Sequence, residues 1–168
     1  MGHRRTNKLD RSRHSNSGFS LIELLVVVAV ILIIAAIAIP NYVQSRMRAN
    51  EASSAQSLRI IATAEQVYST TYSIGYTTNL TQLSGTSATP DPNNAGLIDA
   101  VLASGVKQGY VITYTALTTD PSTSHVLTFS VTADPITTTS GQVHFYTDQT
   151  CVIRSNVSAQ AGPTDNPL

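Results

Sequence analysis

An uninterrupted apolar run from Leu24 to Ile39 separates a basic N-terminal segment from a more polar remainder of the chain. Together with the residues just before this run, the segment 19–39 would be about 31 Å long as a helix, which matches the hydrocarbon core of a bilayer. One carboxylate, Glu23, lies near its beginning. The pattern predicts a membrane-spanning helix over 19–39. Because a carboxylate inside such a span is costly, Glu23 is a candidate functional residue.

Beyond Pro40 the pattern predicts an amphipathic helix over 40–72, so that helical structure covers 19–72. Apolar residues recur at helical spacing along one stripe, which Ile60 and Val67 widen. The stripe consists of Leu58, Ile61, Ala64, Tyr68 and Tyr72. The opposite face is polar and carries Arg48, Asn50, Glu51, Ser54, Gln56, Arg59 and Gln66.

Pro40 has two readings at the junction of the two helical segments. It lacks the N–H that would bond the carbonyl of Ala36, so the helix can bend or partly unwind at this point. Alternatively, Pro40 ends a membrane-spanning helix at the membrane boundary. The continued helical pattern after Pro40 favours the bend.

Residues 73–168 predict one globular domain of loops and short antiparallel strands. Gly and Pro punctuate the segment after Tyr72, where we expect one short turn at 80–83 and one short helix at 96–104. Segments rich in β-branched and aromatic residues predict strands at 110–117, 125–133, 142–147 and 151–154. The polar tail from about residue 155 is expected to be frayed.

The predicted fold class is α+β, with a long N-terminal helix packed on a small C-terminal antiparallel sheet. Clean alternation along 125–133 places Leu127, Phe129, Val131 and Ala133 on one face. Four short strands with one apolar face need a cover, and the apolar stripe of the helix supplies it.

Charge predicts the orientation of the apolar span. Residues 1–18 carry five basic residues and one acid, a net charge of +4, whereas few basic residues follow the span. This excess predicts a cytoplasmic N-terminus, with the remainder of the chain on the other side of the membrane. A secretory signal would have its small-residue cleavage site after the apolar run. Here Gly18 precedes the run, so cleavage there would remove a leader, residues 1–18, and keep the anchor.

The residues from Gly18 to Glu23 resemble the N-terminal signature of the type IV pilins and their pseudopilin relatives. In that family a short basic leader ends in Gly, and Phe and then a Glu at the fifth mature position follow within an apolar segment. In this chain these residues are Gly18, Phe19 and Glu23, and Pro40 stands at the family's usual helix-kinking position.

This resemblance implies cleavage between Gly18 and Phe19 by a prepilin peptidase, and N-methylation of the new Phe19 amine. It further implies insertion in the inner membrane as a precursor and a homopolymer held together by the apolar helices. Assembly would require an assembly platform and an ATPase, and Glu23 and Pro40 would be the residues that serve it. Membrane lipid would cover the helix before assembly.

Glu23 has three candidate roles. After cleavage, the Phe19 ammonium would lie four residues from the Glu23 carboxylate, so the two could pair within one helix. The resemblance favours pairing with another subunit, where opposite charges in a low-dielectric environment would fix the axial register of neighbouring helices. The third role is simple snorkelling of the carboxylate to the headgroups.

Catalytic and metal-binding patterns are weak. The sequence has no GxSxG, glycine-rich phosphate loop or HExxH, and we expect neither an enzyme nor a cofactor or metal site. His125 and His144 could lie on neighbouring strands but lack further ligands, and Asp148 is at most a weak calcium ligand.

Cys151 is the single cysteine, and we interpret it as a small hydrophobic residue in a strand rather than a reactive thiol; intermolecular pairing is the remaining alternative. From Phe19 onward, five basic residues oppose nine acidic ones, which argues against direct nucleic-acid binding.

Three functional hypotheses follow. The leading one is a structural subunit of a type IV pilus, which leaves the inner membrane for an extracellular fibre on the cell surface. The alternative is a pseudopilin of a type II secretion system, although the acidic calcium loop of the major secretion pseudopilins is absent from the sequence. A membrane-anchored enzyme or binding module is the third, and it is opposed by Glu23, which a plain anchor does not need.

Overall fold

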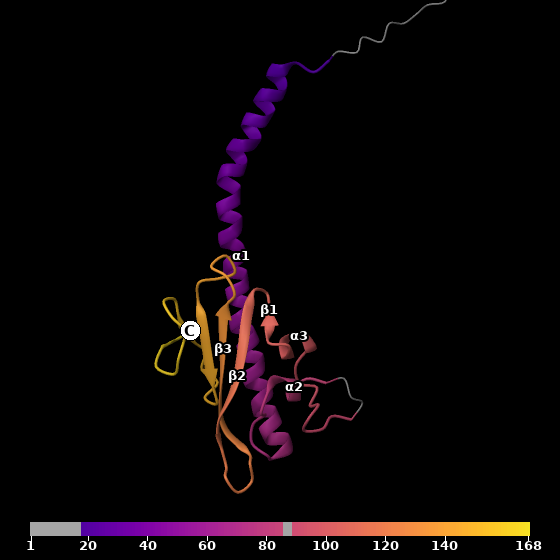
Figure 1. Ribbon diagram of the computed structural model, residues 1–168, viewed down its shortest axis with the longest axis vertical. Helices are drawn as coiled ribbons and strands as arrows, with labels where there is room; N and C mark the ends of the chain where they lie inside the picture. Colours follow the sequence, from indigo (N-terminus) through magenta and orange to yellow (C-terminus); the bar gives the residue numbers. More distant parts are fainter. Residues whose placement is uncertain (1–17, 86–88) are drawn as a thin grey trace, which may run out of the picture. The chain divides into compact units, whose positions relative to one another are not determined.

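Helix α1 runs from Leu21 to Tyr72 in the computed structural model, which describes residues 18–85 and 89–168 (Figure 1). Except for Gly18, the expected leader lies outside the described residues. Pro40 lies inside α1 rather than at its end, and the chain divides between Ile39 and Pro40 into two compact units. The helix thus continues through Pro40, in contrast to the less favoured reading of this proline as a helix terminator.

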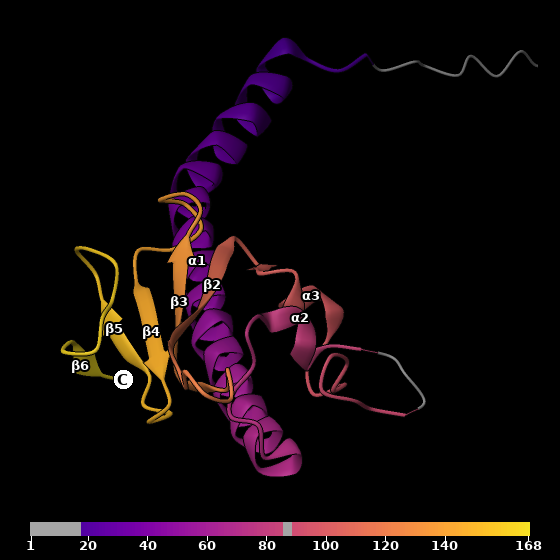
Figure 2. The ribbon, with the colours of Figure 1, turned by 60° about the horizontal axis from the view of Figure 1, so that its bottom comes forward.

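The unit from Pro40 onward contains the second part of α1 and a six-stranded antiparallel sheet whose strands follow chain order (Figure 2). The strands are β1 (Val106–Lys107), β2 (Tyr110–Thr119), β3 (Val126–Pro135), β4 (His144–Asp148), β5 (Arg154–Asn156) and β6 (Asn166–Pro167). This arrangement confirms the predicted α+β class. Strands β1 and β6 were not predicted, because two residues are too few to show an alternating pattern.

Two short helices, α2 (Leu80–Leu83) and α3 (Ala100–Ala103), lie beside the β1 edge of the sheet (Figure 2). Each begins after a capping side chain, because Asn79 accepts from the Gln82 N–H and Asp99 from the Leu102 N–H. The turn expected at 80–83 is therefore a capped helical turn. The helix expected over 96–104 is shorter than predicted and begins only after Asp99.

The core lies between α1 and the sheet. Leu58, Ile61, Ala64 and Tyr68 of the predicted stripe are all buried, and they join strand residues such as Phe129 in one cluster. Ile60 and Val67, expected to widen the stripe, are instead 36% and 41% exposed. Ser54, expected on the polar face, is buried. The buried face of the helix is thus rotated slightly from the predicted one.

Strand β3 departs from simple alternation. Phe129, Val131 and Ala133 are buried as predicted, but Leu127 is 50% exposed and Val126 is buried in its place. The pairing of β2 with β3 shifts register twice near this end, between Ala116 and Thr119. A bulge of this kind reverses the side-chain alternation beyond it. The prediction for Leu127 was therefore wrong.

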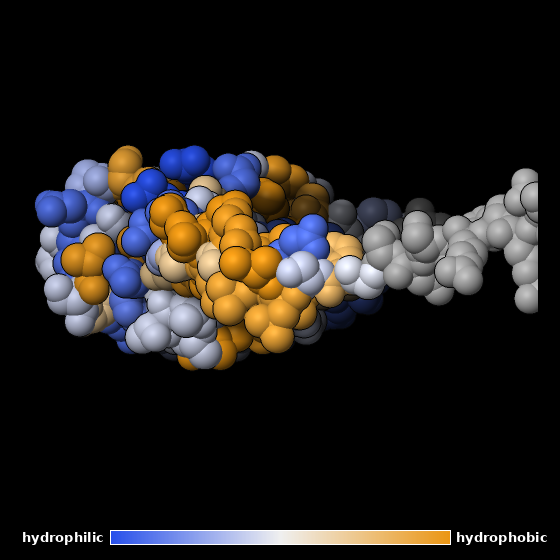
Figure 3. Space-filling view, turned by 90° about the horizontal axis from the view of Figure 1, so that it is seen from above, coloured by the Kyte–Doolittle hydropathy of each residue, from blue (hydrophilic) through white to orange (hydrophobic). Residues whose placement is uncertain are grey.

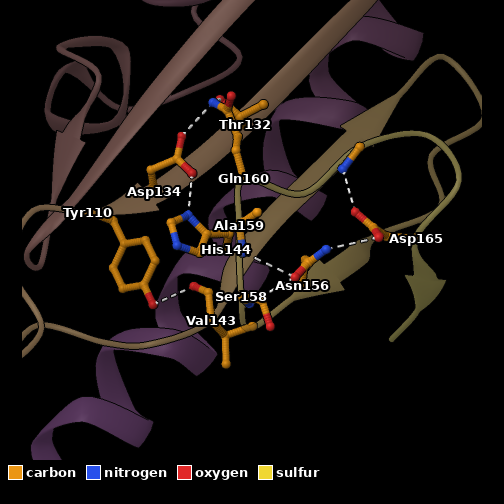
Figure 4. Close-up of polar contacts among 11 residues, drawn as sticks. Tyr110, Thr132, Asp134, Val143, His144, Asn156, Ser158, Ala159, Gln160 and Asp165 are labelled. Carbon is orange, nitrogen blue, oxygen red and sulfur yellow. Dashed lines mark hydrogen bonds and ion pairs between the residues drawn. The ribbon is translucent and has the colours of Figure 1, made fainter.

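The C-terminal tail is tied to the sheet, in contrast to the frayed segment expected from about residue 155. Asp165 accepts hydrogen bonds from Asn156 Nδ2 at 3.0 Å and from the Gly162 N–H at 2.8 Å (Figure 4). Arg154 donates to the Asp165 carbonyl at 2.8 Å, and β6 pairs with β5. The polar composition of the tail suggested fraying, but the side chains of Arg154 and Asp165 form hydrogen bonds with the backbone of the tail itself.

Replacing Asp165 by alanine should loosen this tail. The change removes both side-chain acceptors, so we expect a loss of about 1–2 kcal/mol in local stability. Hydrogen exchange of the Leu168 amide, which donates to the Ile153 carbonyl at 2.9 Å, should become faster. Asp165→Asn keeps one carbonyl acceptor and should give an intermediate rate. Unchanged exchange in both variants would mean that other contacts hold the tail.

Glu65 is fully buried in the helix face that packs on the sheet. Its Oε2 accepts from the Thr77 N–H at 3.0 Å, and its Oε1 accepts from the Thr77 hydroxyl. The Tyr114 hydroxyl donates to the Thr77 carbonyl at 2.7 Å. Desolvation raises the pKa of Glu65, and the Thr77 hydrogen bonds oppose this rise in part. Glu65 thereby connects α1, the segment after it and β2.

The raised pKa of Glu65 predicts a pH dependence of stability. Below the ordinary glutamate pKa of 4.5, the Glu65 carboxyl is protonated in both the folded and the unfolded state. Above this pH the unfolded state loses the proton first, and the folded state keeps it to a higher pH. The contribution of Glu65 is therefore fully present at low pH and declines as pH rises through the raised folded pKa. Glu65→Gln should flatten this part of the curve in denaturant unfolding of the full chain in neutral detergent. Glu51→Gln, on the same helix, is the control and should leave that slope in place. An identical slope in wild type and Glu65→Gln would refute the assignment.

Candidate assembly and processing site

The segment before α1 is exposed. Gly18 and Phe19 precede the first helical residue, Leu21, and the Phe19 side chain is 82% exposed. A Cβ placed on Gly18 would meet no described atom within 4 Å. The Gly18–Phe19 peptide bond therefore lies in a non-helical stretch that an enzyme can reach without unfolding a core.

Glu23 lies in the first turn of α1, where its Oε2 accepts from the Ser20 N–H at 2.9 Å. The Ser20 carbonyl in turn accepts from the Leu24 N–H at 3.2 Å, as expected of a residue that caps a helix. Ser20 and Glu23 have the S-x-x-E spacing of a capping box, in which the acidic side chain satisfies a free N–H at the helix start. The sequence interpretation missed this contact, although the spacing itself was a sufficient signal.

The charge of Glu23 has no ionic partner in the described part of the chain, where the ion pairs join other residues. The capping contact uses one carboxylate oxygen and leaves the negative charge uncompensated. Pairing with a Phe19 ammonium would require prior cleavage, because Phe19 is preceded by Gly18 in this chain. The single chain therefore provides the carboxylate but not a cation for it.

The apolar part of α1 is uncovered. The large side chains from Leu24 to Ile39 are 47–66% exposed, and none of them is buried. They form the apolar surface that Figure 3 shows in orange. By length and composition, α1 is a helix that could cross a membrane. Such a large apolar area needs lipid or other protein to cover it, which fits a membrane-anchored precursor.

In residues 18–85 and 89–168, no group of three or more His, Cys, Asp or Glu side chains is placed to hold a metal ion. His144 Nδ1 lies 2.6 Å from Asp134 Oδ1, and Gln160 donates to the other Asp134 oxygen at 2.9 Å (Figure 4). This pair links β3, β4 and the tail. His125 precedes β3 and does not join it, and Asp148 accepts from the Thr150 N–H and hydroxyl.

Cys151 differs from the prediction of a small hydrophobic residue in a strand. It is exposed, it has a φ of 59°, and its N–H donates to the Asp148 carbonyl. The turn after β4 therefore includes Cys151, and β5 begins only at Arg154 rather than at residue 151. Strand-like composition around 151–154 was misleading because the turn after β4 extends to Cys151.

Comparisons with known proteins find one family model and two pilus proteins. The family model of the prokaryotic N-terminal methylation motif matches residues 13–39. The type IV major pilin protein PilA of Myxococcus xanthus is 39% identical over 61 residues, which cover 36% of this chain and 28% of that protein. The type IV wide pilus major component PilA4 of Thermus thermophilus is 59% identical over 34 residues, or 20% of this chain and 26% of that protein. The matched region thus spans little more than a quarter of either relative.

Proposed function

We propose that this chain, which belongs through its N-terminal segment to the type IV pilin family, is a structural subunit of a type IV pilus. The observation that carries the proposal is the uncovered apolar part of α1, which follows Gly18 and Phe19 and bears one carboxylate, Glu23. Both relatives are named as pilus components, which supports a pilin over the alternative of a type II secretion pseudopilin.

In this proposal the precursor is inserted in the inner membrane with its N-terminus in the cytoplasm. A prepilin peptidase removes residues 1–18 and the Phe19 amine is methylated. The leader's charge of +4 supports this orientation, and the exposed Gly18–Phe19 bond supports the cleavage. The uncleaved leader would otherwise keep five cationic side chains next to the apolar surface that has to pack.

Assembly would exchange lipid for copies of the same helix. Each apolar surface is then buried against neighbouring subunits, and the Glu23 carboxylate meets the Phe19 ammonium of another subunit. Attraction between these charges is strong where water is excluded, so it would select one axial register. The assembly platform and its ATPase would drive this transfer, and Pro40 would allow α1 to adapt during packing. The sheet domain would face outward.

Processing provides a direct test of this proposal. Intact-mass measurement of the cell-associated protein should find a chain that begins at Phe19 and carries one additional methyl group. Gly18→Val should leave the full-length precursor, because it removes the Gly with which the family's leader ends. A wild-type chain that keeps residues 1–18 at steady state would contradict the proposal.

A further inference from the structure

A polar pocket of about 300 Å³ lies within the unit that begins at Pro40, beside the second part of α1. We call it the Arg46 pocket. Its polar side chains come from α1, from the turn between β1 and β2, and from the loop between β3 and β4. These side chains belong to Tyr42, Arg46, Asn50, Gln108, Thr139 and Ser140.

Hydrogen bonds and one close backbone approach fix the turn and the loop that line the Arg46 pocket. Gln108 and Gly109 form a two-residue turn with φ values of 46° and 79°, and the Gly109 carbonyl accepts from the Ile136 N–H at 2.9 Å. A Cβ on Gly109 would lie 2.7 Å from Ser140 Oγ, so only glycine lets the turn and the loop approach this closely. Asn50 Nδ2 donates to the Ser140 carbonyl at 2.9 Å and ties the loop to α1.

The pocket contains two exposed side chains, those of Arg46 and Gln108, whose donors have no protein acceptor among the residues described. Arg46 and Gln108 make no hydrogen bond or ion pair within the described ranges, 18–85 and 89–168. None of the residues that line the pocket is acidic. The Thr139 and Ser140 hydroxyls instead share hydrogen bonds with the Thr137 hydroxyl, at 3.0 and 2.8 Å. The guanidinium of Arg46 and the amide of Gln108 are therefore the donors open to a ligand. Both groups can bind phosphate oxygens, since each oxygen can accept more than one hydrogen bond. The electrostatics of the pocket therefore favour an anion.

We propose that the Arg46 pocket binds a phosphate group, supplied by a phospholipid headgroup while the chain is anchored in the membrane. Arg46 follows the last apolar residue, Ile39, by seven positions, which corresponds to about 10 Å of helix. The headgroup layer of a bilayer extends roughly 5–8 Å beyond the hydrocarbon, so the Arg46 side chain can reach it. The lipid as source rests on the proposed membrane-anchored precursor; the phosphate contact itself does not.

Arg48 is the matched control for this site. It lies two residues further along α1, so its distance from the apolar span differs by only about 3 Å, but it faces a different side of the helix. Arg48 lines another pocket, together with Glu51 and Val143. Simple attraction of basic side chains to a membrane surface would involve both arginines equally, whereas a formed phosphate site requires Arg46 alone.

The test uses the full chain in neutral maltoside micelles, with the amide signals of Gly109 and Ser140 as the readout. One arm adds sodium phosphate against sodium chloride at equal ionic strength, and the other adds phosphatidylglycerol to the micelles. We expect saturable shifts with the lipid, reduced about tenfold in apparent affinity by Arg46→Gln and less than about twofold by Arg48→Gln. Dispersed amide spectra of both variants verify that they are folded.

Each result has one meaning. Saturable shifts with inorganic phosphate as strong as those with lipid support the phosphate site and identify free phosphate as a sufficient source. Equal shifts with chloride, equal losses in the two arginine variants, or no shift with either phosphate source would overturn the proposal. Shifts that appear only when the protein concentration rises would assign the pocket to a second copy of the chain and also overturn it. Because no arm requires pili, a chain that binds phosphate but forms no fibre would contradict only the proposed function.

Discussion

Replacing Glu23 by alanine should leave membrane insertion intact and reduce the yield of surface fibres at least about tenfold. Insertion depends on the apolar span, which the change makes more apolar. Assembly loses its only negative charge in the segment 19–39, and with it the attraction that would fix the register between subunits. Immunoblots of membrane and sheared fractions measure the two quantities separately.

The contact between Glu23 and Ser20 makes alanine alone an incomplete test. Alanine removes both the charge and the acceptor for the Ser20 N–H, whereas glutamine keeps an acceptor of similar reach and removes only the charge. If the charge acts in assembly, Glu23→Gln should be as defective as Glu23→Ala. Fibre yield restored by glutamine would show that the residue serves only to cap α1.

Replacing Phe129 by alanine should cost about 4 kcal/mol of folding stability, a large part of the total for a domain of this size. The Phe129 side chain is fully buried in β3. Its ring centroid lies 4.8 Å from that of Tyr76 in an edge-on arrangement and 5.7 Å from that of Tyr114 in a stacked one. The substitution removes these ring contacts and leaves a cavity between α1 and the sheet. Denaturant unfolding of the full chain in neutral detergent, followed by tyrosine near-ultraviolet circular dichroism, measures the loss.

Leu127 is the matched control on the same strand. Simple alternation would place it beside Phe129 in the core, whereas the bulge exposes half of its side chain. Leu127→Ala should therefore cost less than about 0.5 kcal/mol. A loss comparable with that of Phe129→Ala would mean that the strand keeps regular alternation and that the described register is wrong.

The helix and the class of fold were predictable because they depend on local patterns. The apolar span and the spacing of Leu58, Ile61 and Tyr68 are visible within one helix. The burial of Glu65 continues the same spacing, four residues after Ile61, but a carboxylate at that position requires hydrogen-bond partners such as Thr77, which lies outside the apolar stripe of α1 in the sequence. The exposure of Leu127 depends on a register shift between strands. Such long-range contacts leave no periodic signal in the sequence.

The candidate site divides in the same way. Gly18, Phe19 and Glu23 form a contiguous motif and were found from it, and the Ser20–Glu23 contact was available from spacing alone. The Arg46 pocket was not predictable, because it combines a helix, a turn and a loop that are each at least thirty residues apart in the chain. Its lining residues come together only because the turn at Gly109 brings Gln108 close to the loop that carries Ser140.

The most direct measurement is electron microscopy and mass spectrometry of fibres sheared from cells that make this chain. The account predicts thin filaments whose subunit is this protein, starting at N-methylated Phe19. It would be contradicted by cells with a complete assembly machinery in which the trimmed chain remains a monomer in the bilayer and no filament contains it.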